Sequence, residues 1–369
     1  MTASANDYRY MARALQLAER GLYTVDPNPR VGCVIVLKDQ VIGEGWHERA
    51  GEHHAEIRAL QQAGAAAIGA TVYVTLEPCC HHGRTPPCTD ALLSAGISRV
   101  VIATTDANPS VSGSGVHQLE AAGIDVETGV MIAEARSLNV GFFRRMETGR
   151  PYVRSKIAVS LDGRTALANG VSQWITGDAA REDAQRLRAQ CSAIMTGAGT
   201  IEADNPSLNV RLDEVADGAG RVRQPLRVIV DSRLRIRPES RTLGLPGEVR
   251  VFCIDARPKA RAALEAAGAI VEVTGQQEGR VALPDVMKCL AALEINEVLV
   301  EAGAELNGAL LQAGMLDELI VYMASHILGG DGRGMFAIPE LQDMSSRVEL
   351  ELVEVRRVGV DCRMTYRPR

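Results

Sequence analysis

The chain has 369 residues and a formal net charge of −6, and 46% of its residues are apolar, 23% charged and 4% aromatic. This length is too great for one ordinary core and predicts two domains of a soluble globular protein. The acidic balance and the few aromatic residues argue against a nucleic-acid partner, whereas a small phosphorylated substrate needs only one or two local cations. No apolar run approaches the length of a membrane span and no signal peptide is visible, so we expect a cytoplasmic protein without membrane contact.

The first 148 residues are predicted to form one domain of alternating helices and strands. Apolar residues at helical spacing indicate a helix over 7–19, and two β-rich runs around a turn at 38–40 indicate a hairpin over 31–47. The expected elements that follow are helix 53–63, strand 71–78, helix 85–96, strand 99–105, helix 117–122 and strand 124–127. This alternation is typical of βαβ units around a largely parallel sheet.

A polar segment that contains glycine and proline interrupts the pattern at 146–151. We place the domain boundary there, which gives domains 1–148 and 149–369. The expected strands beyond it are 151–160, 193–197, 225–231, 248–255, 269–274, 297–303 and 317–325, the expected helices are 178–191, 259–267, 284–293 and 304–314, and a β-hairpin is expected over 348–368. The second domain is therefore also α/β, with more strands than helices.

Eight cysteines, three of them beside two histidines within residues 79–88, indicate metal chemistry in a reducing cytoplasm rather than a disulfide framework. The triplet HAE at 54–56 and the pair PC at 78–79 match the two halves of the zinc-deaminase signature, in which the glutamate moves protons and does not bind the metal. The second half departs from that signature, because eight residues rather than two separate Cys79 from Cys88.

The local pattern favours Cys79 and Cys88 over Cys80 as the two thiolate ligands. Adjacent side chains point apart, so Cys79 and Cys80 are poorly placed to bind the same ion. Cys88 lies near the start of a helix that prolines open, where the helix N-terminus stabilises a thiolate.

Three firm ligands, with a glutamate two residues after the ligand histidine, indicate a catalytic zinc ion. A structural site usually has four Cys or His ligands in CxxC pairs, the chain has no CxxC, and His53 is expected to face away from His54. Zinc with an open position activates water, and Glu56 would carry protons to an amino-substituted pyrimidine-like ring and its leaving ammonia. A nucleic-acid deaminase would need a basic, aromatic surface, and a non-catalytic zinc module would not need Glu56.

Several strings carry a family resemblance: DPNPRVGCVIV, HAE and TLEPCCHHGRTPPC in the first half, and SLDGRTA, SQWIT, ADNPSLNVR and VEAGAELNGALLQAG in the second. Together they resemble the bifunctional deaminase/reductase family of riboflavin biosynthesis over nearly the whole chain. The resemblance implies an α/β protein with an N-terminal cytidine-deaminase-like three-layer domain and a C-terminal dihydrofolate-reductase-like domain, and it suggests a homo-oligomer.

The resemblance also implies two consecutive reactions. The first is zinc-dependent hydrolytic deamination of 2,5-diamino-6-ribosylamino-4(3H)-pyrimidinone 5′-phosphate. The second is NADPH-dependent reduction of 5-amino-6-(5-phosphoribosylamino)uracil to the ribitylamino product. Carried onto this sequence, the deaminase residues are the zinc ligands His54, Cys79 and Cys88, the proton donor Glu56, the pyrimidine contacts Asn28, His47 and His81, and the phosphate contact Arg84.

Three of these contacts have ordinary alternatives. Asn28 lies between two prolines, where an asparagine commonly forms an Asx turn. His47 would otherwise be a surface or core histidine. Arg84 would normally be solvated, although a phosphate site needs a cation and few others are near it in the sequence.

The second domain has no GxGxxG after its first strand, which argues against a Rossmann domain. Two glycine-containing segments follow predicted strands instead, at 196–200 and 303–308, and the second opens a helix whose N–H groups suit a phosphate. Each alone is typical of an ordinary turn. Asp204 is our candidate for orienting the reduction or relaying a proton, and its alternative role is an Asx turn before Pro206.

By resemblance, the cofactor contacts are Ala158, Trp174, Thr200, Asp204, Ser232, Gly303, Ala304, Glu305, Leu306, Asn307, Gly308 and Ala309, and the substrate contacts are Ser172, Arg188, Leu208, Arg211 and Glu301. Arg188 and Arg211 suit the substrate phosphate, and Ser232 with Arg233 suits the 2′-phosphate that distinguishes NADPH from NADH. Lys156 lies within a predicted strand, and periodicity leaves open which face it occupies.

Overall fold

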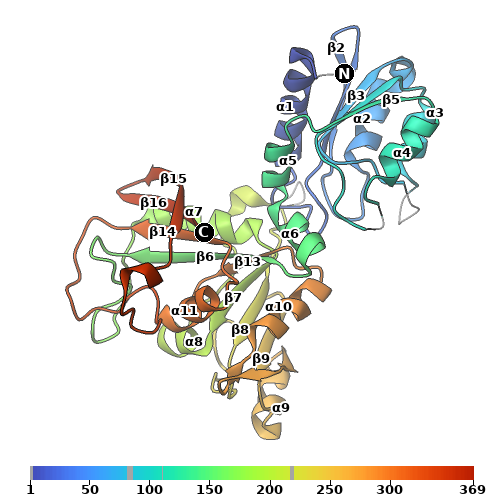
Figure 1. The fold of residues 1–369 in the computed structure, drawn as a ribbon. Coiled ribbons are helices and arrows are strands. Elements are labelled where there is room, and N and C mark those ends of the chain that lie inside the picture. The colour runs from blue at the N-terminus through green and yellow to red at the C-terminus, as the bar shows by residue number, and fades with distance from the viewer. Residues whose placement is uncertain (1–2, 81–85, 110, 217–219) are drawn as a thin grey trace. The chain divides into compact units, whose positions relative to one another are not determined.

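The computed structural model describes residues 3–80, 86–109, 111–216 and 220–369. The chain forms two compact units, Met1–Gly149 and Arg150–Arg369, which are described separately below (Figure 1). Within the described ranges, no helix is long and apolar enough to cross a membrane.

Unit 1 contains a five-stranded mixed sheet with the order β2-β1-β3-β4-β5. Strand β1 runs antiparallel to β2 and β3, whereas β3, β4 and β5 are parallel to one another. The strands are β1 (Gly32–Leu37), β2 (Gln40–Trp46), β3 (Thr71–Val74), β4 (Arg99–Ile102) and β5 (Asp125–Thr128). The helices are α1 (Ala5–Glu19), α2 (Ala55–Ala63), α3 (Cys88–Ser94), α4 (Ser114–Ala121), α5 (Ile132–Leu138) and α6 (Val140–Thr148), with a 3-10 turn η1 (Gly64–Ala67).

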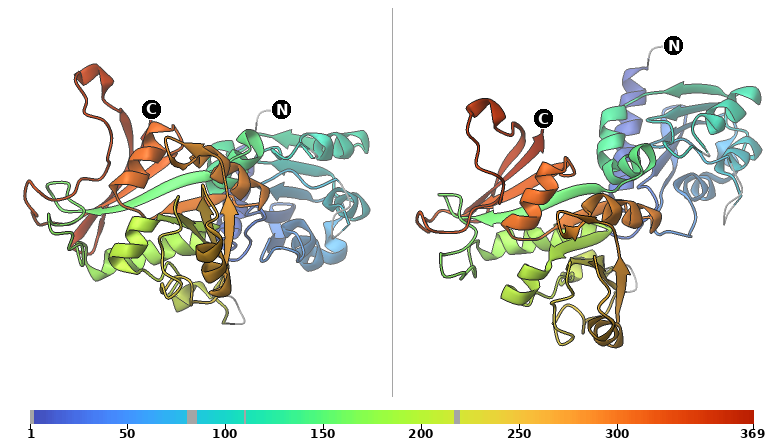
Figure 2. Two further views of the ribbon diagram at one scale, coloured as in Figure 1. Left: turned by 90° about the horizontal axis from the view of Figure 1, so that it is seen from below. Right: turned by 60° about the horizontal axis from the view of Figure 1, so that its bottom comes forward.

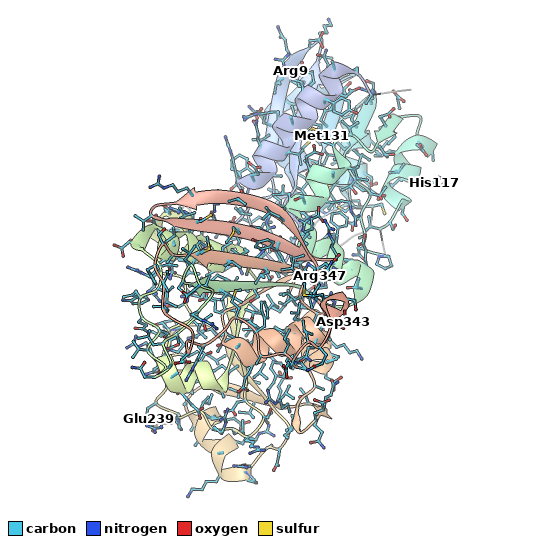
Figure 3. The ribbon with its side chains drawn as sticks, turned by 60° about the vertical axis from the view of Figure 1, so that its left-hand side comes forward. Arg9, His117, Met131, Glu239, Asp343 and Arg347 are labelled. Atoms are coloured by element: carbon cyan, nitrogen blue, oxygen red, sulfur yellow. The ribbon has the colours of Figure 1, made fainter. Side chains whose placement is uncertain are left out.

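Helices cover both faces of this sheet, which makes three layers (Figures 1 and 2). Because side chains alternate along a strand, β1 sends Ile35 to one face and Val34 to the other. Ile35 packs in a buried cluster with residues of α2, α3 and α4, and Val34 packs in a second cluster with residues of α1 and α5. His117, labelled in Figure 3, lies on the exposed side of α4.

Unit 2 contains a nine-stranded sheet with the order β10-β9-β8-β7-β13-β6-β14-β16-β15. Strands β10 to β14 in this order are parallel, and the terminal hairpin β15–β16 is antiparallel at one edge. The strands are β6 (Tyr152–Val159), β7 (Ala193–Gly197), β8 (Leu226–Val230), β9 (Val249–Cys253), β10 (Ala269–Val273), β13 (Glu297–Val300), β14 (Glu318–Met323), β15 (Leu350–Val358) and β16 (Asp361–Pro368).

Helices also pack on both faces of the second sheet. Residues of α7 (Asp178–Gln190), α8 (Ala198–Asp204) and α9 (Pro258–Ala266) join one buried cluster, and residues of α10 (Leu283–Ala292) and α11 (Ala304–Gln312) join the other. Three short elements lie outside the sheet: the hairpin β11 (Gln276–Gln277) with β12 (Arg280–Val281), and the 3-10 turns η2 (Asp213–Val215) and η3 (Met344–Ser346). Asp343 and Arg347, which flank η3, are labelled in Figure 3.

Most of the predicted elements are confirmed, and four differences matter. The strand predicted over 71–78 ends at Val74, so an irregular segment carries Cys79. Helices α5 and α6 were not predicted, and α6 extends to Thr148, into the segment 146–151 where the domain boundary was placed. Helix α8 begins directly after β7, where glycines at 197 and 199 predicted a loop. These three helices have only seven to nine residues, too few for a clear period of 3.6.

Candidate active sites

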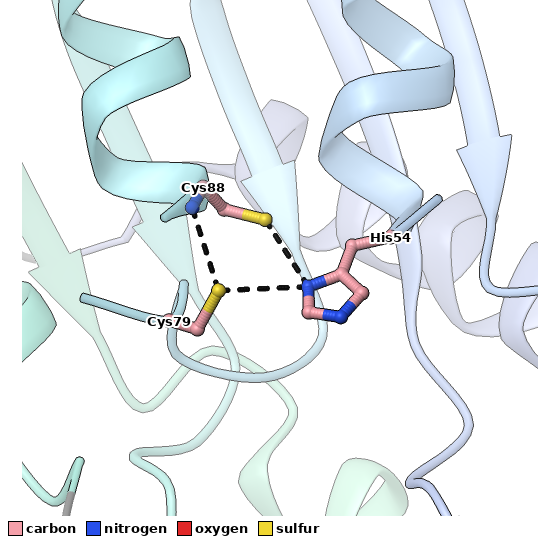
Figure 4. A group of neighbouring side chains, drawn as sticks. All are labelled: His54, Cys79 and Cys88. Carbon is pink, nitrogen blue, oxygen red and sulfur yellow. Dashed lines mark hydrogen bonds between the residues drawn. The ribbon is translucent and has the colours of Figure 1, made fainter. Parts of the chain in front are cut away.

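Three predicted ligand side chains of unit 1 meet at one point (Figure 4). His54 Nδ1 lies 3.3 Å from Cys88 Sγ and 3.5 Å from Cys79 Sγ. From normal Zn–N and Zn–S bond lengths, the nitrogen-to-sulfur edge of a tetrahedral zinc site is about 3.5 Å. The donor set and its spacing therefore fit a zinc ion. Among the described residues, His54, Cys79 and Cys88 form the group of three or more potential ligands that lie close enough together to hold a metal.

Each ligand comes from a different segment of unit 1. His54 immediately precedes α2, Cys79 lies in the loop after β3, and Cys88 is the first residue of α3. Glycine at position 45 brings α2 close to β2, because a Cβ there would lie 2.3 Å from the Ala55 carbonyl oxygen. This close approach fixes the start of α2, and with it the position of His54.

Hydrogen bonds favour the thiolate form of Cys79. The Cys88 side chain, the His54 ring and the Cys88 backbone N–H, 3.4 Å from Cys79 Sγ, all contribute. They lower the pKa of Cys79 to about 4 even though its burial acts in the opposite direction. Zinc binds the thiolate form of cysteine. Because the lowered pKa favours that form, the loss of the Cys79 proton costs little free energy when zinc binds.

Glu56, on the first turn of α2, is 3% exposed. Burial raises the pKa of its carboxyl group above the ordinary value. Its Oε2 atom is buried and has no hydrogen-bond partner among the described residues. A carboxyl group with a raised pKa and an unsatisfied oxygen beside a metal site suits a group that accepts a proton and passes it on.

His47 and Asn28 form a fixed pair next to the zinc ligands. His47 Nδ1 lies 3.1 Å from the His53 carbonyl oxygen, so it carries the proton and donates it, and His47 Nε2 accepts from Asn28 Nδ2 at 3.0 Å. Burial lowers the pKa of His47 to about 4, which keeps the ring neutral at pH 7. Because the Asn28 amide nitrogen faces His47, its Oδ1 is directed elsewhere and is suited to accept a hydrogen bond from an amino group.

The remaining predicted residues of this site cannot be placed in the same way. His81 and Arg84 lie outside the described residues. Cys80 is half-buried, and the metal-binding group of described residues does not include it.

Unit 2 contains a cavity of about 1310 Å³. Pockets that bind drug-sized ligands have volumes of about 300–1,000 Å³, so this larger cavity suits a dinucleotide together with a second molecule. The predicted contact residues that line it are Ala158, Ser172, Trp174, Arg188, Thr200, Asp204, Leu208, Arg211, Ser232, Glu301, Gly303, Ala304, Glu305, Leu306 and Ala309.

The cavity lies along the carboxyl ends of four neighbouring parallel strands, β8, β7, β13 and β6. Gly197 ends β7, Ser232 follows β8 and Glu301 follows β13, so residues distant in sequence meet at one edge of the sheet. Ligands bind at this edge in open α/β sheets. The topology therefore explains why these three segments line one cavity.

Two residues of the predicted 303–309 segment do not line the cavity. Asn307 is 1% exposed and its side chain bonds to the Ser155 hydroxyl and the Ala302 carbonyl oxygen, at 2.7 and 2.9 Å. A Cβ at position 308 would lie 2.1 Å from the Ala337 carbonyl oxygen, so Gly308 permits a close backbone approach. On a helix, residues of a continuous run face in different directions, and these two face inward.

A partly buried charge cluster lines the cavity. Arg188 donates two hydrogen bonds to the Glu301 carboxylate, at 2.5 and 2.9 Å. Burial opposes ionisation of Glu301, but the charge of Arg188 outweighs it and lowers the pKa of Glu301 to about 2. Burial lowers the pKa of Lys156, which also lines the cavity and interacts with the Glu301 charge.

Lys156 is thus a cavity residue whose position the sequence pattern left open. The burial pattern of β6 shows which face Lys156 occupies, because Lys156 and Ala158 alternate with the buried Ser155 and Ile157. Five other basic residues of the lining had no distinguishing sequence signal: Arg181, Arg235, Arg241, Arg280 and Arg333.

Asp204 and Trp174 lie at the exposed rim of the cavity. Ser172 Oγ donates to Asp204 Oδ1 at 3.2 Å, which links two predicted contacts. Trp174 is 70% exposed, and the Arg181 guanidinium lies 4.7 Å from its ring centroid. A flat, amphipathic side chain at the mouth suits contact with a nucleotide base or ring.

Comparison with known families gives one match in each unit. Residues 4–104 match the cytidine and deoxycytidylate deaminase zinc-binding region, and residues 151–364 match the RibD C-terminal domain. The N-terminal unit therefore has a cytidine-deaminase-like fold, and the C-terminal unit is a reductase domain with a dihydrofolate-reductase-like fold. Both agree with the predicted fold class.

Several relatives match nearly the whole chain. The riboflavin biosynthesis protein RibD of Escherichia coli (strain K12) is 48% identical over 361 residues, which cover 96% of this chain and 97% of the relative. A structure of Acinetobacter baumannii RibD is 45% identical with a TM-score of 0.91, and the match covers 98% and 99% of the two chains. A structure from Thermotoga maritima, described as a diaminohydroxyphosphoribosylaminopyrimidine deaminase/5-amino-6-(5-phosphoribosylamino)uracil reductase, is 34% identical with a TM-score of 0.86 and coverage of 98% and 99%.

These matches cover both the zinc-binding region and the reductase region of the chain. The chain belongs to the RibD family, the bifunctional deaminase/reductases of riboflavin biosynthesis, with a zinc-binding deaminase domain followed by a reductase domain.

Proposed function

We propose that the deaminase domain hydrolyses the 2-amino group of 2,5-diamino-6-ribosylamino-4(3H)-pyrimidinone 5′-phosphate. We further propose that the reductase domain converts the resulting 5-amino-6-(5-phosphoribosylamino)uracil to its ribitylamino product with NADPH. The observation that carries the proposal is the His54, Cys79 and Cys88 donor set beside the buried Glu56, in the same chain as the reductase cavity.

In the deaminase domain, His54, Cys79 and Cys88 would hold the zinc ion, which acts as a Lewis acid and makes water nucleophilic near neutral pH. Glu56 would take a proton from the activated water at Oε2 and pass it to the ring nitrogen. It would then take a second proton from the hydroxyl group added to the ring carbon and pass it to the departing ammonia. The neutral His47 ring orients the Asn28 amide, whose Oδ1 would accept from the pyrimidine. His81 as a further ring contact and Arg84 as the phosphate contact remain predictions from the family resemblance.

In the reductase domain, NADPH supplies the hydride when it is bound. The α11 N-terminus, at Gly303 and Ala304, suits the cofactor's phosphates, and Ser232 with Arg233 suits its 2′-phosphate. Ser232 is held in place, because its Oγ accepts from the Val281 N–H at 3.1 Å.

The charge cluster suits the substrate end of the cavity. Arg188 and Arg211 would bind the phosphate, and Glu301 would hold Arg188 in a fixed orientation. Lys156 has a lowered pKa and lines the same wall, so it would protonate the nitrogen or oxygen atom on ribose C1′ that keeps the electron pair when hydride adds to C1′. Asp204 would orient substrate or cofactor through Ser172.

A two-step assay tests the proposal. Purified zinc-loaded protein is given the diamino pyrimidinone phosphate, released ammonia is measured, and NADPH is then added and its oxidation followed. We expect ammonia release first and NADPH oxidation only on the deaminated product. Absence of ammonia would reject the deaminase assignment, and failure to oxidise NADPH on supplied uracil intermediate would reject the reductase assignment.

Serine substitutions test the ligand set. We expect Cys79→Ser and Cys88→Ser to lose most of their zinc, because a serine hydroxyl is not a thiolate ligand. Cys80→Ser, the matched control on the neighbouring residue, is expected to keep one zinc per chain. Zinc content after dialysis is measured by mass spectrometry, and a zinc-free Cys80→Ser would show that the ligand set is wrong.

Glu56→Gln separates proton transfer from metal binding. We expect the variant to keep its zinc and lose about 10²- to 10⁴-fold in the rate of ammonia release, because the amide cannot accept the proton. NADPH oxidation on supplied uracil intermediate should be unchanged, which serves as the control within the same chain. Zinc loss in this variant would instead indicate that Glu56 binds or supports the metal.

Lys156→Met is the corresponding test in the reductase domain. We expect the rate of NADPH oxidation to fall by at least about 10²-fold, because the buried ammonium group is removed from beside Glu301. Ammonia release should be unchanged, and Lys288→Met, on an exposed site of α10, is the matched control. Wild-type reductase kinetics in Lys156→Met would remove Lys156 from the mechanism.

We also propose that the protein is a cytoplasmic homo-oligomer. Edge strand β15 supports self-association, because it leaves its outer backbone groups unpaired by the sheet and exposes Leu352 and Val355, at 54% and 55%. Sedimentation velocity on the full chain tests this, and a monomer at all concentrations would contradict it.

A further inference from the structure

Glu77 has a buried carboxylate that the proposed chemistry does not use. It lies two residues before Cys79 and is 4% exposed. Its Oε2 atom accepts from the backbone N–H groups of Asp106 and Gly113, both at 3.0 Å, and its Oε1 atom accepts from those of Gly115 and Val116, at 2.8 and 3.2 Å. Four backbone donors thus converge on one side chain.

These donors belong to a segment distant in sequence from Cys79. Two of them are in the first turn of α4, where helix N–H groups have no acceptor within the helix. Helix α4 has no side-chain cap of its own, and its preceding residue, Gly113, is one of the donors. The Glu77 carboxylate therefore caps α4 from another segment and places a negative charge at the positive end of the helix.

The contact also depends on a glycine. A Cβ on Gly115 would lie 2.3 Å from the Pro78 carbonyl oxygen, closer than any real contact. The first turn of α4 therefore rests directly on the Glu77–Pro78 backbone.

The Cys79 backbone is held from its other side as well. Thr89, on the first turn of α3, donates its N–H to the Cys79 carbonyl oxygen at 3.2 Å, and its hydroxyl bonds to Gln118 of α4 at 2.9 Å. Helices α3 and α4 are thereby joined around the loop that presents the Cys79 thiolate. The Glu77 N–H completes the attachment by donating to the Thr104 carbonyl oxygen at 3.0 Å.

We propose that Glu77 is a positioning residue of the zinc site, which fixes Cys79 Sγ relative to His54 and Cys88 by tying the loop to α4. The proposal rests on the zinc-ligand set of the proposed function. A carboxylate is required because it offers about four lone-pair positions to four donors. A glutamine has one acceptor oxygen, and its NH₂ group would face two of the N–H groups.

Glu77→Gln in the full chain is the test, with zinc affinity measured by chelator competition. We expect the dissociation constant to rise by about 10- to 100-fold, as for other residues that orient metal ligands. The cobalt-substituted variant should show shifted and weakened visible and thiolate charge-transfer bands, because Cys79 Sγ is displaced. NADPH oxidation on supplied uracil intermediate should match the wild type, which shows that the chain is intact.

Two further variants complete the design. Gly115→Ala pushes α4 away from Pro78 without touching any charge, so it should weaken zinc binding in the same direction. Glu120→Gln removes an exposed carboxylate from the same helix and should leave zinc affinity and the cobalt spectrum unchanged. If Glu77→Gln does not fold, Gly115→Ala carries the test.

The outcomes are distinguishable from those of the proposed function. Wild-type zinc affinity and an unchanged cobalt spectrum in folded Glu77→Gln or Gly115→Ala would overturn the proposal. A lowered unfolding temperature with an unchanged spectrum would also overturn it, because it would reveal a purely structural role. If the wild-type chain binds zinc but releases no ammonia, the deaminase proposal fails and the role of Glu77 is still decided by these two measurements.

Discussion

Both sites place charged groups out of water, and a buried charge is stable only if hydrogen bonds or an opposite charge compensate it. The four N–H groups around the Glu77 carboxylate meet this requirement in the deaminase domain. Arg188 meets it for Glu301 in the reductase domain, through a two-bond pair. Each compensating partner comes from a different element, so satisfying the charge also fixes how the elements are arranged around the chemistry.

The two domains build their sites in different ways on related α/β architecture. The zinc site is compact, because three ligand atoms within 4.8 Å of one another come from two helix starts and one loop. The reductase site is a cavity at the carboxyl ends of parallel strands, lined by residues of the strands and of the segments that follow them. A single hydrolytic centre needs a fixed point, whereas a reduction must hold two molecules side by side.

The predicted elements agree with the structure where a short stretch of sequence specifies the backbone conformation. Helix α2 ends before Gly64, which has a φ of 55°, and the hairpin turn falls at residues 38 and 39 between β1 and β2. The short helices α5, α6 and α8 were not predicted, and the family resemblance implied cofactor contacts along the whole of 303–309. Asn307 and Gly308 instead serve packing, with Ser155 and the Ala337 backbone as their neighbours. Which face of a helix points into a cavity depends on what the helix packs against, and this decides which of its residues can touch a ligand.

The amino-acid pattern alone predicted the kinds of chemistry present: one imidazole, two thiols and a glutamate in deaminase spacing, and glycine-rich strand ends in a second α/β domain. It did so because donor atom type and short spacing are properties of the covalent chain. Three features became visible only in the folded chain: Lys156 and Glu301 line the same cavity, Glu77 holds the Cys79 loop against α4, and Asn28 presents its oxygen away from His47. These features depend on strand register and helix packing, and on interactions between residues far apart in the sequence. Lys156 and Glu301, whose charges interact, are 145 positions apart, and no local pattern encodes such a pairing.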